Sequence, residues 1–239
     1  MTEISGLINI NKPAGVTSFW VVKQVKRILG IKKVGHCGTL DPLADGVLVI
    51  LYGKATKLQD RLMSDEKLYR TTLKLGLTTD TADITGKTLK TAPVKTFNKA
   101  EIEAVLSGFM GEIEQVPPMY SAIKYGGTRL YKFAREGREV VREPRKITIK
   151  NIELLRYGPE TLELRIECSK GTYIRTLGED IGIKLGCGAA VQSLCRERSG
   201  QFSLETSLDG RKLQAMGREE LLNSCKDAGT FVPGAGAQI

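Results

Sequence analysis

Apolar runs and alternating segments in the first third of the chain predict strands separated by a helix. Residues 7–10 and 47–52 are largely apolar, which is typical of short buried strands, and residues 69–75 alternate apolar with polar positions as a half-buried strand does. Apolar side chains recur at helical spacing over residues 21–29, after a Thr-Ser pair that can cap a helix and before Gly30, which can end it. We therefore expect the order strand, helix, strand, strand.

The rest of the chain mixes the same patterns with longer breaks. Asn98 and Glu101 have the spacing of a capping box, which opens a helix over residues 99–106. Residues 111–128 hold a Pro-Pro and a Gly-Gly pair and are expected to form a loop. The other expected elements are a helix over 129–135, an antiparallel strand pair over 147–157 and 161–168, a helix over 172–185, a helix-to-strand passage over 190–202 and a short helix at 219–222.

These elements mix strands and helices without regular alternation, which favours an α+β fold over a doubly wound parallel sheet. The 239 residues contain no internal repeat and are enough for one large domain or two small ones. We expect one large domain over residues 1–205. Residues 206–239 then form a short C-terminal segment, whose Gly- and Ala-rich end over 229–239 is expected to fray.

Charge favours an anionic partner. The chain has 36 Lys and Arg against 27 Asp and Glu, a formal charge of +9, and 41% of its residues are hydrophobic. Such a balance suits RNA or an acidic membrane surface. The alternative, a soluble protein that happens to be basic, stays open at this point.

Cysteine, histidine and glycine motifs exclude several classes of protein. The five cysteines are an odd number without a Cys-x-x-Cys pair, which indicates a reducing compartment, so we expect a cytoplasmic protein. No signal peptide is evident, and the longest wholly apolar run, residues 47–52, is too short to span a bilayer. His36 is the only histidine, and neither G-x-G-x-x-G nor G-x-x-x-x-G-K-S/T occurs. We expect no metal, no nucleotide cofactor and no membrane association.

One carboxylate, Asp41, lies in a Gly- and Pro-rich segment directly before the apolar run at 47–52. Pro42 disfavours helical backbone at Asp41, and the nearby glycines permit tight turns and close approach of a ligand. A short loop anchored to a buried strand can hold a reactive group still. Taken alone, this pattern favours an Asx-turn, in which Asp41 bonds backbone amides, over catalysis.

The surrounding motifs change that interpretation, because together they resemble the TruB-type tRNA pseudouridine synthases. They are GHCGTLDPLADGVL at 35–48, NKPAGVTS at 11–18, KLYR at 67–70, TTDTAD at 78–83, QVPPMYSAIK at 115–124 and CSKGTYIRTL at 168–177. The resemblance covers most of the chain. It implies a pseudouridine synthase fold, a mixed and largely antiparallel sheet with a central cleft flanked by helices. Many relatives carry a C-terminal RNA-binding domain of the PUA type, and residues 206–239 are too few for a complete one.

The resemblance assigns roles to five residues of the site. Asp41 matches the essential catalytic aspartate, and Arg175 matches an arginine that pairs with it and keeps it ionised and oriented. Tyr69 matches the aromatic residue that stacks on the flipped target base, and Tyr173 and Leu194 are expected to line the same pocket. From the residues alone, core packing of Tyr69 and Leu194 and a surface position for Arg175 remain alternatives.

Basic and aromatic residues elsewhere are expected to contact RNA. His36 matches a histidine that packs against RNA near the extruded nucleotide. Residues 111–128 resemble an RNA-clasping loop, with Lys124, Arg129 and Lys132 able to reach phosphates. A solvated basic helix face is an equal alternative for any one of these side chains.

Two positions depart from the family pattern, because threonine is usual where Cys37 and Asp45 stand. Cys37 stands beside His36, which could suggest an activated thiol nucleophile. Adjacent residues seldom aim their side chains at one another, so we expect Cys37 to pack in the core. Asp45 would raise the proton affinity of a carboxylate if it lay close to Asp41. We expect it to point to solvent instead.

The resemblance implies an enzyme that isomerises the uridine at position 55, in the TΨC loop of tRNA, by base flipping. We expect a monomer that binds the T-arm and needs no cofactor. Two rival functions are a synthase acting on another RNA, with or without a guide RNA, and a non-enzymatic RNA-binding or RNA-folding protein on the same scaffold. Asp41, Tyr69 and Arg175 favour the enzyme, since binding alone does not need that carboxylate.

Overall fold

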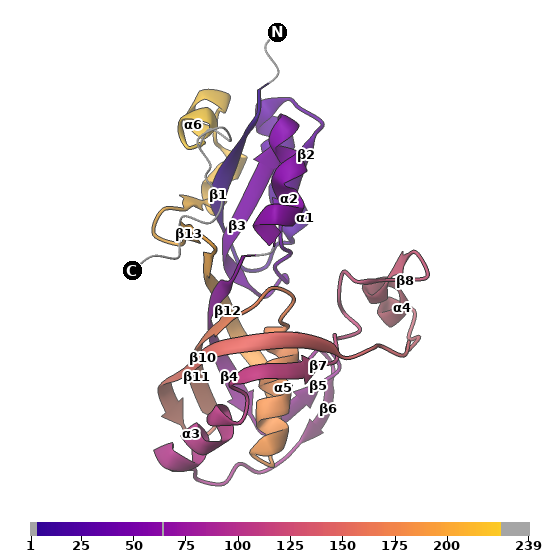
Figure 1. The fold of residues 1–239 in the computed structure, drawn as a ribbon, viewed down its shortest axis with the longest axis vertical. Coiled ribbons are helices and arrows are strands. Elements are labelled where there is room, and N and C mark those ends of the chain that lie inside the picture. The colour runs from indigo at the N-terminus through magenta and orange to yellow at the C-terminus, as the bar shows by residue number, and fades with distance from the viewer. Residues whose placement is uncertain (1–3, 64, 226–239) are drawn as a thin grey trace. The chain divides into compact units, whose positions relative to one another are not determined.

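The computed structural model describes residues 4–63 and 65–225 and divides into two units (Figure 1). Unit 1 comprises Met1–Tyr69 with Cys195–Ile239, and unit 2 comprises Arg70–Leu194. Strands β4 (Lys67–Leu75) and β12 (Ala189–Ser199) pass through the two boundaries. The middle of the chain is thus an insertion between two parts of unit 1.

Unit 1 is built around β3, a strand that is buried on both faces. Its elements are β1 (Gly6–Lys12), α1 (Ser18–Leu29), β2 (Val34–Cys37), β3 (Asp45–Tyr52), a 3-10 turn (Gly53–Leu58), α2 (Gln59–Met63), β13 (Phe202–Ser203), β14 (Leu208–Asp209), a second 3-10 turn (Gly210–Gln214) and α6 (Arg218–Asn223). Strand β3 pairs antiparallel with β1 and with β2, and parallel with the second half of β12. Both edges of β3 are therefore paired, as expected of a central strand, and its apolar side chains are buried on the two faces of the sheet.

Helix α1 forms as its sequence predicts. Thr17 accepts a hydrogen bond from the Trp20 backbone N–H, and Gly30 adopts left-handed backbone at the other end. The apolar stripe at helical spacing is buried, and it comprises Val21, Val22, Val25 and Leu29.

Residues 206–225 pack against the first elements of unit 1. Strand β14 pairs parallel with β1, with Leu208 opposite Ile10. Arg27 of α1 donates to the carbonyls of Leu213 and Gln214 at 2.8 and 3.0 Å. The short helix expected at 219–222 is confirmed by α6, while the expected fraying of 229–239 lies outside the described residues.

Unit 2 has a sheet of four main strands and one long helix against it. Its elements are β5 (Leu77–Thr79), β6 (Thr88–Thr91), α3 (Lys99–Ser107), β7 (Gly111–Gln115), β8 (Lys124–Tyr125), β9 (Thr128–Arg129), α4 (Leu130–Arg135), β10 (Arg145–Gly158), β11 (Thr161–Cys168) and α5 (Ile174–Lys184). The order of the main strands is β4-β11-β10-β7. Gly178 of α5 lies so close to Leu73 of β4 that an added Cβ would be 2.7 Å from Leu73 Cδ2. Helix α5 therefore rests directly on the sheet (Figure 1).

Two sequence expectations in unit 2 and at its boundary were wrong. Residues 111–115 are not loop but strand β7, which pairs antiparallel with β10. Residues 190–202 carry no helix: Ala189–Ser199 is the strand β12, and Phe202–Ser203 is β13. Both segments lack a clear strand pattern, so partner strands far away in the chain decide their conformation.

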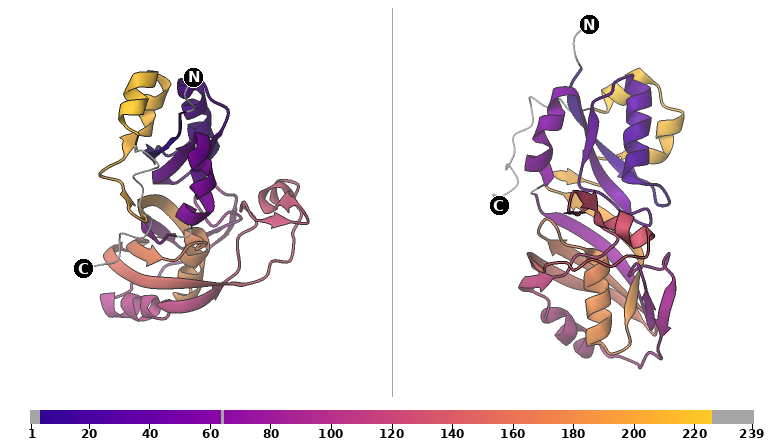
Figure 2. Two further views of the ribbon diagram at one scale, coloured as in Figure 1. Left: turned by 45° about the horizontal axis from the view of Figure 1, so that its top comes forward. Right: turned by 90° about the vertical axis from the view of Figure 1, so that its right-hand side faces the viewer.

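Residues 116–144 of unit 2 stand apart from its sheet in Figure 1 and in the left view of Figure 2. They hold the β8–β9 hairpin, in which Lys124 faces Arg129, and helix α4. The capping box at Asn98 is confirmed, as is the antiparallel pair β10–β11. No helix among the described residues is long and apolar enough to cross a membrane.

Close packing of α5 makes Gly182 a sensitive position. An added Cβ would lie 2.2 Å from the Ala189 backbone nitrogen and 2.4 Å from the Gly188 carbonyl carbon. We expect Gly182→Ala to lower the free energy of unfolding by about 1–3 kcal/mol or more, since backbone must move. Ile183→Ala, the next residue and 64% exposed, is the matched control and should change it by less than about 0.5 kcal/mol. Equal effects in urea unfolding would contradict this account.

Candidate active site

Asp41 lies in the loop between β2 and β3, and its side chain is half-buried. The residues from Gly38 to Ala44 form neither helix nor strand, as Pro42 predicts. The loop is short and leads directly into the buried strand β3. Its geometry suits a carboxylate that must be held in one place.

Backbone hydrogen bonds from other segments hold this loop. Ser18 Oγ accepts from the Leu40 N–H at 2.9 Å and donates to the Leu40 carbonyl at 3.0 Å. The Gly15 N–H donates to the Pro42 carbonyl at 2.7 Å. Residues on both sides of Asp41 are thus attached to the segment that opens α1.

A buried lysine lies under the same loop. Lys12 is fully buried, and its Nζ donates to the carbonyls of Pro13 and Val16 at 2.9 and 2.8 Å. Burial lowers the pKa of Lys12 to about 8, and the nearby carboxylates of Asp45 and Asp41 oppose that shift. Sequence reasoning missed Lys12, although it stands inside the NKPAGVTS motif.

The two positions that depart from the family pattern differ in outcome. Cys37 is 1% exposed and belongs to a core cluster with Val47, Val49 and Phe202, so its packing role is confirmed. Burial raises the pKa of its thiol to about 12. The expectation that Asp45 points to solvent was wrong, because its Oδ1 is buried and accepts no hydrogen bond within the described residues.

The aromatic and apolar site residues lie on regular elements. His36 is half-buried in β2, opposite Ile50. Tyr69 is 9% exposed in β4, Leu194 is 8% exposed in β12, and Tyr173 is the half-buried residue that caps α5. Burial of this kind leaves both the pocket role and the core-packing alternative open for Tyr69 and Leu194.

Gln115 fixes the start of α5. Its Oε1 accepts from the Tyr173 N–H at 2.8 Å, and its Nε2 donates to the Tyr173 carbonyl at 3.1 Å. Gln115 is 3% exposed and ends β7. The side-chain amide thereby binds both backbone groups of the residue two positions before Arg175.

Arg175 is not a surface residue. It is 4% exposed, and it donates to the carbonyls of Thr81 and Tyr120, both at 2.8 Å. Its Nε lies 3.9 Å from the Asp83 carboxylate. The guanidinium is thus oriented by groups from two separate segments of unit 2.

Asp83 is the acidic anchor of this arrangement. Its Oδ1 accepts from Thr81 Oγ1 at 2.9 Å and from the Thr85 N–H and Oγ1 at 2.9 and 2.5 Å. The preceding residue, Ala82, has a φ of +57°, an uncommon conformation for a residue with a side chain. Strain of this kind is typical of functional sites. Asp83 lies within the TTDTAD motif, but the resemblance implied no role for it.

The structure assigns the predicted site residues to both units. Asp41, His36 and Tyr69 belong to unit 1, whereas Arg175, Tyr173 and Leu194 belong to unit 2. Pairing of Asp41 with Arg175 therefore stays a prediction. The expected RNA contacts, Lys124, Arg129 and Lys132, are all exposed on the β8–β9 hairpin and α4.

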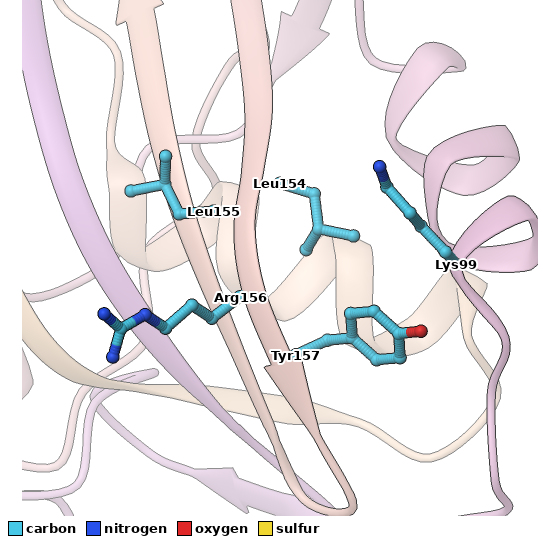
Figure 3. Close-up of a pocket in the computed structure, with 5 residues that line it drawn as sticks. All are labelled: Lys99, Leu154, Leu155, Arg156 and Tyr157. Carbon is cyan, nitrogen blue, oxygen red and sulfur yellow. The ribbon is translucent and has the colours of Figure 1, made fainter.

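Two hollows in the surface of unit 2 contain few of the predicted site residues. A hollow of about 440 Å³ beside β10 and α3 contains no predicted site residue. It is lined by Lys99, Leu154, Leu155, Arg156 and Tyr157 (Figure 3). A second hollow of about 300 Å³ includes Lys124, Tyr125 and Arg142. Among the described residues, no group of three or more His, Cys, Asp and Glu could hold a metal ion.

Comparison with known families identifies the class. The model of the TruB family pseudouridylate synthase N-terminal domain matches residues 26–174, and that of the tRNA pseudouridylate synthase B C-terminal domain matches residues 175–225. The chain belongs to the TruB family of pseudouridine synthases. The predicted family and fold are thereby confirmed.

Individual relatives agree with the family match. The chain is 48% identical to the tRNA pseudouridine synthase B of Endomicrobium trichonymphae, over 86% of this chain and 90% of that protein. It is 50% identical to the same-named protein of Pseudomonas fluorescens, over 91% of this chain and 71% of the relative.

Among solved structures, a Cbf5-Nop10-Gar1 complex contains a chain of 30% identity with a TM-score of 0.71, covering 93% of this chain. An H/ACA RNP bound to a substrate RNA containing 2′-deoxyuridine gives 27% identity and a TM-score of 0.68. This chain spans 60% and 59% of the length of those two chains.

Burial of Lys12 predicts a pH dependence of stability. Its folded pKa of about 8 lies below the ordinary value of 10.5, so between these pH values the unfolded chain binds more protons than the folded protein. The free energy of unfolding of the wild type should therefore rise relative to that of Lys12→Met between about pH 7 and 10, by about 2–3 kcal/mol. Denaturant titrations across this range measure the difference. Lys23→Met, which removes an exposed lysine of α1, is the control, and a flat difference for Lys12→Met would contradict the account.

Cys37 should resist alkylation in the folded protein. With a pKa of about 12 it carries on the order of a thousandfold less thiolate at pH 8 than an ordinary cysteine. Iodoacetamide labelling followed by peptide mass spectrometry should leave Cys37 unmodified in the native protein and modified in urea. Rapid native labelling of Cys37 would show that the thiol is reactive after all.

Proposed function

We propose that this protein isomerises uridine to pseudouridine in tRNA, at the uridine of the TΨC loop. The observation that carries the proposal is the match of residues 26–225 to the TruB family, with Asp41 in a loop that other segments hold in place. The relatives at 48–50% identity are named tRNA pseudouridine synthase B. Their names favour tRNA as the RNA partner over other RNAs.

The reaction breaks the N-glycosidic bond of the uridine, rotates the base and joins its C5 to the ribose. In the proposed mechanism Asp41 supplies the carboxylate, either as a nucleophile towards the ribose or base or as a proton acceptor. Arg175 pairs with Asp41 and orients it, while Asp83 and the Thr81 carbonyl hold the guanidinium. Tyr69 provides the aromatic face on which the flipped uracil stacks.

RNA affinity is proposed to come from the residues that stand apart from the sheet of unit 2. Lys124, Arg129 and Lys132 are exposed there and free to reach phosphates without displacing core contacts. His36 and Tyr173 would contact the RNA nearer the extruded nucleotide. The formal charge of +9 supports an anionic partner, and binding should weaken steeply with salt.

We further propose that the protein acts as a monomer in the cytoplasm and recognises the T-arm. The rival in which the scaffold only binds or folds RNA predicts no selection for a held carboxylate. The hydrogen bonds to Leu40 and Pro42 on either side of Asp41 favour the enzyme.

Asp41→Asn should abolish pseudouridine formation and leave tRNA binding within about twofold, because the amide can neither attack nor accept the proton. Incubation with unmodified tRNA, followed by pseudouridine mapping and a binding titration of the same preparation, tests the assignment. Asp45→Thr, four residues further along at the start of β3, is the matched control and should keep most of the turnover. Near-normal yield from Asp41→Asn would overturn the catalytic role of Asp41.

An isolated T-arm stem-loop should be modified nearly as well as whole tRNA, because it holds the target uridine and the phosphates within reach of Lys124, Arg129 and Lys132. Removing the acceptor end of tRNA should then matter little. Comparison of kcat/KM for whole tRNA, end-trimmed tRNA and the stem-loop decides this. A large loss on trimming would show that contacts beyond the T-arm supply much of the affinity.

A further inference from the structure

Arg196 of β12 is a fully buried arginine close to the Asp41 loop, and no role follows for it from the family motifs quoted above. It is 1% exposed and among the largest buried side chains of the protein. Its Nε donates to the Val47 carbonyl at 2.7 Å, and its Nη2 donates to the Gly38 carbonyl at 3.1 Å. Burying a guanidinium is costly unless its N–H groups are bonded. The burial of Arg196 at this place therefore needs an explanation, and its two carbonyl partners suggest one.

The two accepting carbonyls lie at opposite ends of the loop that carries Asp41. Gly38 directly follows β2, and Val47 is the third residue of β3. A planar guanidinium has its donors in a rigid arrangement, so it fixes the separation of two carbonyls better than a flexible ammonium would. Arg196 therefore bridges the base of the loop.

Glycines at both ends make room for this bridge. Arg196 lies opposite Gly46 in the parallel pairing of β12 with β3. Gly46 has a φ of +103°, and a Cβ there would lie 2.4 Å from the Arg196 carbonyl oxygen. Gly38 has a φ of +86°, and a Cβ there would lie 3.4 Å from Arg196 Nη1. The left-handed backbone at Gly38 and Gly46 thus leaves the space that Arg196 occupies when it bonds the two carbonyls.

We propose that Arg196 is a positioning residue for Asp41. By holding the Gly38 and Val47 carbonyls together, it keeps the loop in the conformation that places the Asp41 carboxylate for reaction. This inference rests on the proposed function, in which Asp41 is the reacting group. An apolar side chain of equal volume would fill the space but leave both carbonyls without this donor.

The first test compares Arg196→Lys with Arg198→Lys, the same change two residues along β12. The ammonium of Arg196→Lys keeps the charge but cannot bridge both carbonyls in one plane. We expect the single-turnover rate of Arg196→Lys to fall about 10- to 100-fold, since a misplacement of about 1 Å can cost that much, with the Kd for tRNA within about twofold. Arg198→Lys should retain both values within about twofold. An unchanged rate for a folded Arg196→Lys, or a loss confined to Kd, overturns the proposal.

A second measurement does not depend on activity. Hydrogen–deuterium exchange of the peptides covering residues 38–47 should be at least about tenfold faster in Arg196→Lys, with peptides from β10 and β11 unchanged. Equal exchange in wild type and variant rejects the bridge. If neither Arg196→Lys nor Arg196→Met folds, Arg196 is a folding residue and the positioning role is rejected. If the wild type forms no pseudouridine, the proposed function fails, while the exchange data still decide whether Arg196 holds the loop.

Discussion

The backbone of the Asp41 loop is the constraint on which the candidate chemistry depends. A loop of this length has few contacts of its own, and here other segments of unit 1 provide them: Ser18 bonds both backbone groups of Leu40, Gly15 bonds Pro42, and Arg196 bonds both ends. These partners come from two distant parts of the chain, the segment that opens α1 and strand β12. The carboxylate is therefore positioned by the folded unit as a whole, which lowers the conformational entropy that the reaction must otherwise overcome.

Unit 2 uses the same principle for its arginine. Carbonyls of Thr81 and Tyr120 accept from Arg175, and the Asp83 carboxylate lies nearby with its other oxygen bonded within its own turn. A buried guanidinium with these partners has little freedom to reorient. Gln115 adds a second restraint through the backbone of Tyr173. In unit 1 the bonds restrain the backbone around Asp41, whereas in unit 2 backbone carbonyls bind the Arg175 guanidinium itself.

The proposed RNA contacts have a different physical character. Lys124, Arg129 and Lys132 are exposed on short elements that stand apart from the sheet of unit 2 (Figure 2). Long basic side chains on such a segment can adapt to a phosphate backbone without disturbing a core. The molecule thus combines restrained groups where bonds would be broken with adaptable groups where charge alone is recognised.

Local patterns in the sequence were sufficient for α1, α3 and the β10–β11 pair, because caps, apolar spacing and turn residues act within a few positions. They also predicted the packing of Cys37 and, through the motifs, the family. Strands β7 and β12 were missed, since their partner strands supply what their own patterns lack. Asp45, Asp83 and Arg196 could not be assigned from sequence for a similar reason. The burial of one carboxylate oxygen, the approach of Asp83 to Arg175 and the bridge from Arg196 all depend on residues brought together only when the sheets form.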